Sequence, residues 1–161
     1  MSDTPFKSLD NSALRRSDER GYLEVLYEQG QVVLKRSFSK AGVFRGMHLQ
    51  RPPHTQTKLI RVASGRILDF VTDPSKVPVQ LYRRELGPSD GWVQIDAHLA
   101  HGFYAIEDTE FEYLCLGAYN ESSEVSYSIF AVLQSEFGLS NLKLSVKDQA
   151  ALQLTVVNMP A

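Results

Sequence analysis

Clusters of turn-forming residues divide the sequence into short apolar runs, and this division constrains the fold more than any other feature. The clusters EQG, RPPH, SG, DPSKVP, GPSDG and EDTE supply the Gly, Pro, Asp and Ser that tight turns require. No long segment between them shows helical periodicity, so the runs are predicted to be strands. The strands are expected at 21–28, 31–39, 43–50, 58–64, 66–73, 79–86, 92–96, 102–107 and 110–119.

Many short strands at this spacing predict an all-β fold, either a sandwich or a barrel, with a cupin-type jelly roll as a member of that group. The chain has 161 residues, of which 43% are hydrophobic. It is therefore long enough to bury its own core, and we expect a single domain over residues 1–161. After residue 120 the strand pattern weakens. LSVKDQAALQL predicts a short C-terminal helical segment, and TVVNMPA is expected to be a frayed tail.

The net charge and the cysteine content restrict the possible partners and the cellular compartment of the protein. A net charge of −2 provides no field that favours nucleic acid or an anionic membrane. MSDTPFKSLD lacks the features of a signal peptide, and no apolar run reaches the roughly 18 residues of a membrane span. The single cysteine, Cys115, cannot form an internal disulfide, which suits a reducing compartment. We therefore expect a cytoplasmic protein with neither a nucleic-acid nor a membrane partner.

One stretch, GVFRGMHLQRPPHTQTKLIRVASG, concentrates two histidines, three arginines and a lysine in what otherwise reads as a pair of strands. It is either an edge strand with solvated charges or part of the wall of a ligand pocket. Period-two alternation places Lys58, Asp69 and Tyr113 on the same strand faces as apolar neighbours. Burying such groups without partners is costly, so the pattern favours a solvated or ligand-filled barrel mouth. The alternative is a different register that leaves these groups on the wet face.

Several motifs then occur in a fixed order: FRGMHLQRPPHTQTKLIRVASGRILDFVTD, AHGF, FEY and LSVKD. The set resembles the dTDP-4-dehydrorhamnose 3,5-epimerase family, whose motifs are similar to RGLHFQ, AQGKLVRV, GEVFDVAVD, FAHGF and LSAKD. The resemblance extends from about residue 17 to residue 152. It implies a cupin-type jelly roll, usually a homodimer, that uses no metal or organic cofactor. Such enzymes invert carbons beside the ketone of a nucleotide-linked 4-keto-6-deoxy sugar.

The resemblance assigns four catalytic roles that the chemistry requires. A hydrogen on C3 or C5 is acidified by the C4 ketone, because its removal gives an enolate, and reprotonation from the opposite face inverts the centre. His48 matches the base and Tyr113 the acid on the other face. Lys58 matches the cation that stabilises the enolate oxygen. Asp148 matches the carboxylate that orients the histidine.

Each of these residues has a structural alternative. His48 could be a strand histidine packed beside Phe44 and Gly46, and Tyr113 an ordinary strand aromatic. Lys58 could be a surface lysine. Asp148 could serve a helix N-terminus, because Ser145 stands three residues before it. Asp69 is a rival orienting group for His48, or it pairs with His101.

The resemblance also predicts substrate-binding residues, and the chain departs from the family at several of their neighbours. The QDNHS-like polar run reads VLKRSFS here, the SPTFGxW loop reads VPVQLYR, and a proline and a glycine before AHGF are replaced. One residue fewer separates AHGF from Tyr113. The reaction class is therefore more firmly indicated than the nucleotide or the product. The predicted substrate-binding residues are Arg20, Glu24, Arg45, Gln50, Asp69 and His101.

Two other classes of function remain open at this stage. A metal cupin could use His48, His54 and His101 as ligands, but such enzymes usually present His-x-His with a following Glu, which is absent here. We therefore predict no metal site and read His54 as a surface residue. A sugar-binding jelly roll without catalysis could use Arg20 and Arg45 to hold its ligand.

Overall fold

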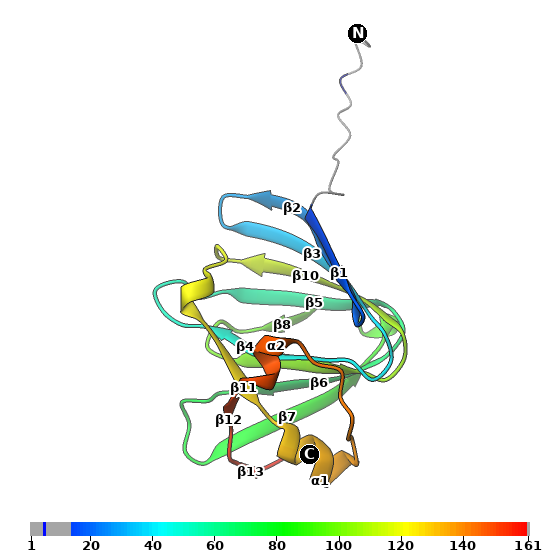
Figure 1. Cartoon of the computed structure of the whole chain (residues 1–161). Coiled ribbons are helices and arrows are strands. Elements are labelled where there is room, and N and C mark those ends of the chain that lie inside the picture. The colour runs from blue at the N-terminus through cyan, green and yellow to red at the C-terminus, as the bar shows by residue number, and fades with distance from the viewer. Residues whose placement is uncertain (1–4, 6–13, 161) are drawn as a thin grey trace.

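Two facing β-sheets form the body of the protein in the computed structural model, which describes residues 5 and 14–160 (Figure 1). The first sheet has the order β1-β2-β3-β10-β5-β8 and the second the order β12-β11-β4-β9-β6-β7-β13. Most neighbouring strands are antiparallel, as expected when strands follow one another through short turns. The all-β prediction is confirmed. The strands of the first sheet are β1 (Arg15–Asp18), β2 (Gly21–Gln29), β3 (Val32–Ser39), β10 (Thr109–Leu116), β5 (Thr57–Ser64) and β8 (Val93–Ile95).

The second sheet contributes the strand that holds the predicted base. Its strands are β12 (Leu152–Gln153), β11 (Glu124–Ser128), β4 (Phe44–Gln50), β9 (Ala100–Ala105), β6 (Ile67–Thr72), β7 (Val79–Leu86) and β13 (Val156–Asn158). Two short 3₁₀ turns, η2 (Pro88–Asp90) and η3 (Glu121–Ser123), lie in the connections. Within the part of the chain that the structure describes, the helices are α1 (Phe130–Phe137) and α2 (Val146–Gln149), both from the last quarter of the chain.

An apolar core fills one part of the space between the sheets. The rings of Phe103 on β9 and Phe111 on β10 stack across it with centroids 4.6 Å apart. Such a pair adds to the free energy gained from burying the apolar surface. The core joins the two sheets, so the polar groups beside it have fixed positions. Its buried members are Ile60, Val62, Ile67, Leu86, Ile95, Phe103 and Phe111.

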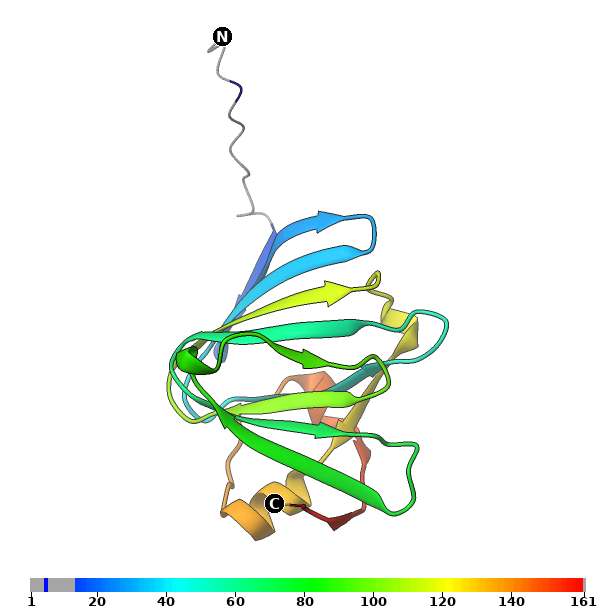
Figure 2. The same cartoon turned by 180° about the vertical axis from the view of Figure 1, so that it is seen from behind.

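A second core covers the other face of the second sheet, where α1 packs (Figure 1 and Figure 2). Phe44 and Phe70 from the sheet meet Phe130 and Phe137 from the helix in edge-on or tilted ring contacts. The helix ends at Gly138, whose φ of 63° allows the left-handed turn that satisfies the last carbonyls. The second sheet is therefore buried on both faces, which holds β4 firmly in place.

A register shift in β4 decides which of its side chains face the inside of the barrel. Pairing with β9 is irregular between Arg45 and His48. Phe44 and Met47 join the core under α1, whereas Arg45 and His48 lie opposite residues of β9 that face the space between the sheets. Simple alternation, which grouped His48 with Phe44, is wrong at this point because the shift adds one position.

The nine expected strands are all present, with ends that differ by a few residues. The sequence pattern missed β1, β11, β12 and α1, and the helix expected in LSVKDQAALQL is confined to α2. The expected frayed tail TVVNMPA is wrong in part, because β13 pairs in parallel with β7. MSDTPFKSLD, which is predicted not to be a signal peptide, lies outside the described residues apart from residue 5. Among the described residues, no helix is long and apolar enough to cross a membrane.

Candidate active site

His48 and Asp148 form a close pair at the inner face of β4. Nε2 of His48 lies 2.6 Å from Oδ1 of Asp148. The histidine side chain is about one-third exposed (32%), whereas the aspartate is almost fully buried (2%). A buried carboxylate on one ring nitrogen fixes the tautomer and leaves the other nitrogen, Nδ1, for a ligand.

Asp148 is positioned by α2, although the helix has only one turn. Its backbone N–H donates to the Ser145 hydroxyl, which caps the helix at 3.0 Å. The Asp148 carboxylate also accepts a hydrogen bond from the Gly46 backbone N–H at 3.3 Å. Ser145 therefore performs the capping that the sequence left open, and the Asp148 side chain is directed at β4 instead.

Tyr113 enters the barrel from the opposite sheet. It lies on β10, opposite Lys35 of β3 and Ile60 of β5, and its ring contacts that of Phe111 at 5.1 Å between centroids. Burial raises the pKa of the phenol, and the nearby Arg45 guanidinium partly offsets this rise. The hydroxyl is therefore protonated at neutral pH and available as a donor.

Lys58 projects from the same sheet as Tyr113, as alternation predicted. It lies opposite Cys115 of β10 and Ile95 of β8. Burial lowers the pKa of the ammonium, and the charge of Lys35 lowers it further, while Cys115 and Glu124 act in the opposite direction. Among the described residues, Lys58 has no carboxylate within salt-bridge distance. A half-buried cation without such a partner favours an anionic ligand.

Two arginines lie together at one end of the site. Arg45 donates to the Ser39 hydroxyl at 2.8 Å and to the Phe38 carbonyl at 3.3 Å. Burial lowers the pKa of Arg45. The charge of Arg20 lowers it further, whereas the charge of Asp18 raises it. Arg20 itself forms an ion pair with Asp18 at 2.5 Å. The charge of Arg20 therefore reaches Arg45, and both groups are guanidinium forks of the kind that suit phosphate oxygens.

Asp69 pairs with His101 and not with His48. Nε2 of His101 lies 2.7 Å from Oδ1 of Asp69, and both side chains are buried. His101 is the direct partner of His48 in the β4–β9 pairing, so two histidine–aspartate pairs lie side by side. Of the two carboxylates that the sequence left open, Asp148 is the one in contact with His48.

Three other residues considered from the sequence make their own contacts outside these groups. Glu24 points to the opposite face of the first sheet, where it pairs with Arg15 at 2.8 Å. The Gln50 side chain donates to the backbone carbonyls of His54 and Ala118 and so ties two loops together. His54 is exposed and meets the Ser123 hydroxyl at 2.9 Å.

The structure adds charged residues that the sequence reading did not single out. Lys35 lies next to Tyr113 in the sheet register, and its ammonium is 5.0 Å from the centre of the Tyr119 ring. Glu124 lies 4.0 Å from Nδ1 of His48. Alternation in VVLKRSFS could have indicated Lys35, because it shares a face with Val33 and Ser37. Glu124 follows residue 120, where the strand pattern had faded.

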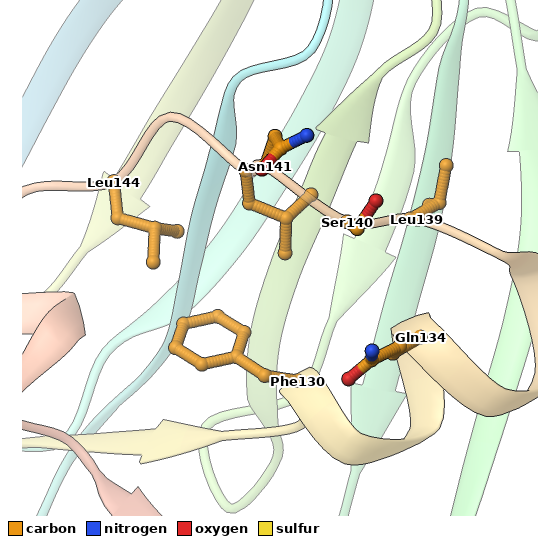
Figure 3. A pocket seen from close by; sticks show the side chains of 7 residues that line it. Phe130, Gln134, Leu139, Ser140, Asn141 and Leu144 are labelled. Atoms are coloured by element: carbon orange, nitrogen blue, oxygen red, sulfur yellow. The ribbon is translucent and has the colours of Figure 1, made fainter.

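Two cavities differ in their relation to this site. One, of about 330 Å³, lies between α1 and the segment after it, and Figure 3 shows Phe130 and Gln134 facing that segment. None of the predicted site residues line this cavity. The other, of about 300 Å³, includes Asp69, Tyr82 and Arg84. It lies beside the Asp69–His101 pair, at the strands β7 and β8.

The histidines are not arranged as a metal site. His48 and His101 each contact an aspartate, and His54 lies in an exposed loop. Within residues 5 and 14–160, no group of three or more His, Cys, Asp or Glu side chains is placed to hold a metal ion.

Comparison with known proteins gives one consistent family. The family profile described as dTDP-4-dehydrorhamnose 3,5-epimerase matches residues 12–155. A protein of that name from Salmonella typhimurium is 33% identical over 159 residues, covering 83% of each chain. Another from Mycobacterium tuberculosis is 33% identical over 102 residues, which make up 55% of this chain and only 46% of the relative. The chain therefore matches less than half the length of the latter.

Solved structures agree with the sequence relatives. A dTDP-4-dehydrorhamnose 3,5-epimerase from Sulfolobus tokodaii has 27% identity and a TM-score of 0.67, covering 86% of this chain and 85% of its own. A dTDP-6-deoxy-D-glucose-3,5-epimerase from Legionella pneumophila, solved in complex with dTDP-4-keto-L-rhamnose, has 29% identity and a TM-score of 0.63. The match covers 87% of this chain and 83% of that one.

Proposed function

Because the chain belongs to the dTDP-4-dehydrorhamnose 3,5-epimerase family, we propose that it inverts C3 of a nucleotide-linked 4-keto-6-deoxy sugar. The observation that supports this most directly is the placement of His48 and Tyr113 on opposite sheets, with Lys58 beside Tyr113. A base and an acid on facing walls can remove a proton from one face of a sugar ring and return one to the other.

The proposed reaction begins at His48. Its Nδ1 accepts the C3 proton, and the electron pair of the C–H bond moves to the C4 carbonyl oxygen to form an enolate. Asp148 stabilises the resulting imidazolium through Nε2, which it contacts at 2.6 Å. The Lys58 ammonium donates to the enolate oxygen. Its burial strengthens this interaction, because the local dielectric constant is low.

The second half of the reaction belongs to Tyr113. Its protonated phenol donates to C3 from the face opposite His48, the carbonyl re-forms, and the centre is inverted. The proton on His48 and the one missing from Tyr113 are then exchanged with solvent, so the enzyme returns to its starting state. The high pKa that burial gives the phenol keeps this donor protonated before each turnover.

The cations of the site support an anionic substrate. Arg45 and Arg20 are placed near each other and suit a diphosphate. Lys58 and Lys35 lie further along the first sheet, on either side of β10. We propose that the diphosphate contacts the arginines while the keto sugar lies between His48 and Lys58. His101 and Asp69 then form the floor beside the sugar.

Further features of the protein are part of the same proposal. The family profile covers most of the chain, which supports one domain over residues 1–161. The family resemblance supports a homodimer and a reaction without a metal or an organic cofactor. The single free cysteine, Cys115, is buried, which supports a reducing, cytoplasmic setting.

The test is conversion of dTDP-4-keto-6-deoxyglucose, with the UDP-linked sugar in parallel, followed by NMR of the sugar ring. We expect inversion at C3, and the coupling constants at C5 report whether that centre is inverted as well. Tight binding of both sugars without any conversion would overturn the proposal and indicate a sugar-binding jelly roll without catalysis.

A further inference from the structure

Glu124 lies beside His48 on the side away from Asp148. Oε1 of Glu124 is 4.0 Å from Nδ1 of His48, while Asp148 contacts Nε2 of the same ring. The Glu124 side chain is 12% exposed. The imidazole of the proposed base therefore lies between two carboxylates, one at each ring nitrogen.

Lys147 holds the Glu124 carboxylate in place by donating from Nζ to Oε1 at 2.5 Å. The Tyr119 hydroxyl is close enough to act on the pKa of the same carboxylate. Burial alone would raise the pKa of Glu124, but Lys147 and His48 outweigh it, so the pKa is lowered. Burial and Glu124 together raise the pKa of Tyr119 to about 12, so the phenol stays a donor. Glu124 is thus a fixed negative charge.

The contact with Lys147 also connects the elements that carry the base and its partner. Lys147 precedes Asp148 on α2, and Glu124 begins β11, the strand that pairs with β4. Ser126 of β11 lies directly opposite His48. The Lys147–Glu124 ion pair therefore links the helix that supplies Asp148 to the sheet that supplies His48.

The other charged groups around His48 contact or influence residues other than His48 itself. His101 faces it from β9 but contacts Asp69. Arg45, on β4 itself, influences Asp148 and Tyr113. The charge of Lys58 reaches Glu124 from β5, and Tyr113 faces the site from β10. Apart from Asp148, Glu124 is the carboxylate closest to the ring in the described part of the chain.

We propose that Glu124 is a positioning residue that acts through His48, and that Lys147 sets the strength of its effect. The inference rests on the proposed function. The negative charge of Glu124 stabilises the imidazolium that forms when His48 takes a proton from the sugar. Two charges about 4 Å apart interact appreciably near a protein surface. Lys147 offsets part of this charge and so limits the effect of Glu124 on His48.

The test is the pH dependence of kcat/KM in Glu124→Gln and Lys147→Met. Losing the negative charge should move the low-pH limb of the profile down by about one pH unit, and losing the positive charge should move it up by about half a unit. Lys147→Arg should restore the original limb. Rates that fall equally at every pH, with the limb unmoved, would show a merely structural role and overturn the inference.

A second measurement does not depend on turnover. NMR titration of the His48 ring in the free protein should show the same opposite shifts of the midpoint in the two variants. Glu85→Gln, on the exposed ion pair with Arg66, is the matched control and should leave the midpoint unmoved. If the wild-type protein converts no 4-keto sugar but the midpoints move, the proposed function fails and the tuning of His48 stands. If the midpoints do not move, the inference fails whatever the activity.

Discussion

Nε2 of His48 lies 2.6 Å from Oδ1 of Asp148, although 100 positions of sequence separate the two residues. The pair depends on two local features that bring them together. A register shift in β4 turns His48 into the barrel, and the Ser145 cap orients α2 so that the Asp148 side chain reaches it. The proposed base is therefore fixed by the core under α1 and by a single helical turn.

Asp148→Asn should lower kcat about 10- to 100-fold, because it keeps a hydrogen-bonding side chain but removes the charge that stabilises the imidazolium. Asp69→Asn should have a smaller effect, since Asp69 contacts His101 and not His48. Steady-state kinetics of both variants, with thermal melts to verify folding, make the comparison. A larger loss from Asp69→Asn would show that the orienting carboxylate has been misassigned.

Lys58→Met should lower kcat about 10²- to 10³-fold while making the free protein more stable. The activity falls because the donor to the enolate oxygen is lost. Stability rises, by about 1 kcal/mol, because a half-buried ammonium without a carboxylate partner is replaced by an apolar side chain. Since the pKa of Lys58 is lowered on folding, its cost is complete below that lowered pKa and fades as the pH rises from it towards the ordinary value. Urea unfolding at pH 7 that shows Lys58→Met to be less stable would contradict this.

Gly46→Ala should destabilise the fold by about 3 kcal/mol or more. Gly46 has a φ of +114°, and an added Cβ would lie 2.5 Å from Cα of Gly102 and 2.6 Å from the carbonyl oxygen of His101. Gly30→Ala is the matched control, because Gly30 also has a positive φ (+59°) but nothing within 4 Å of the added atom. It should cost only about 1 kcal/mol. Equal losses in urea unfolding would mean that close packing of β4 on β9 is not what requires Gly46.

Glu112→Gln should lower stability by about 1–2 kcal/mol at pH 7, and the difference should vanish in acid. Burial acts to raise the pKa of Glu112, but hydrogen bonds from Arg36 and Arg61 outweigh it and lower the pKa. A carboxyl with a lowered pKa stabilises the fold above its ordinary value of about 4.3, and this contribution is lost as the pH falls through the lowered pKa. Unfolding curves at pH 7, 5 and 3 measure it. A difference that does not change with pH would contradict the assignment to charge.

The strands could be predicted from the sequence where an apolar run is flanked by turn-forming residues. Between residues 21 and 119 each apolar run is bounded by turn residues, and there the expected and observed strands agree. After residue 120 the helix α1 was missed because it has only eight residues, too few to establish a helical period. Its place is determined by packing against Phe44 and Phe70, which are distant in the sequence.

The site was predictable only in part for a similar reason. Alternation was sufficient for Lys58 and Tyr113, because β5 and β10 are regular there. It failed for His48, since the register shift at Gly46 depends on the close approach of β9. Glu124 could not have been found from the pattern, because its role depends on the positions of α2 and β11. Local sequence thus predicts which residues lie on a strand, while contacts between strands decide which of them meet.

Exchange of carbon-bound hydrogen in deuterated water tests the central claim most directly. With a 4-keto-6-deoxy nucleotide sugar, the wild-type protein should introduce deuterium at C3, and NMR with mass spectrometry should place one deuteron there, or two if C5 is inverted as well. His48→Asn should slow this exchange by roughly 10²-fold or more while nucleotide binding is retained, because the proton acceptor is lost. Wild-type protein that leaves C3 unlabelled with every such sugar, or a His48→Asn variant that exchanges within about tenfold of wild type, would contradict the account.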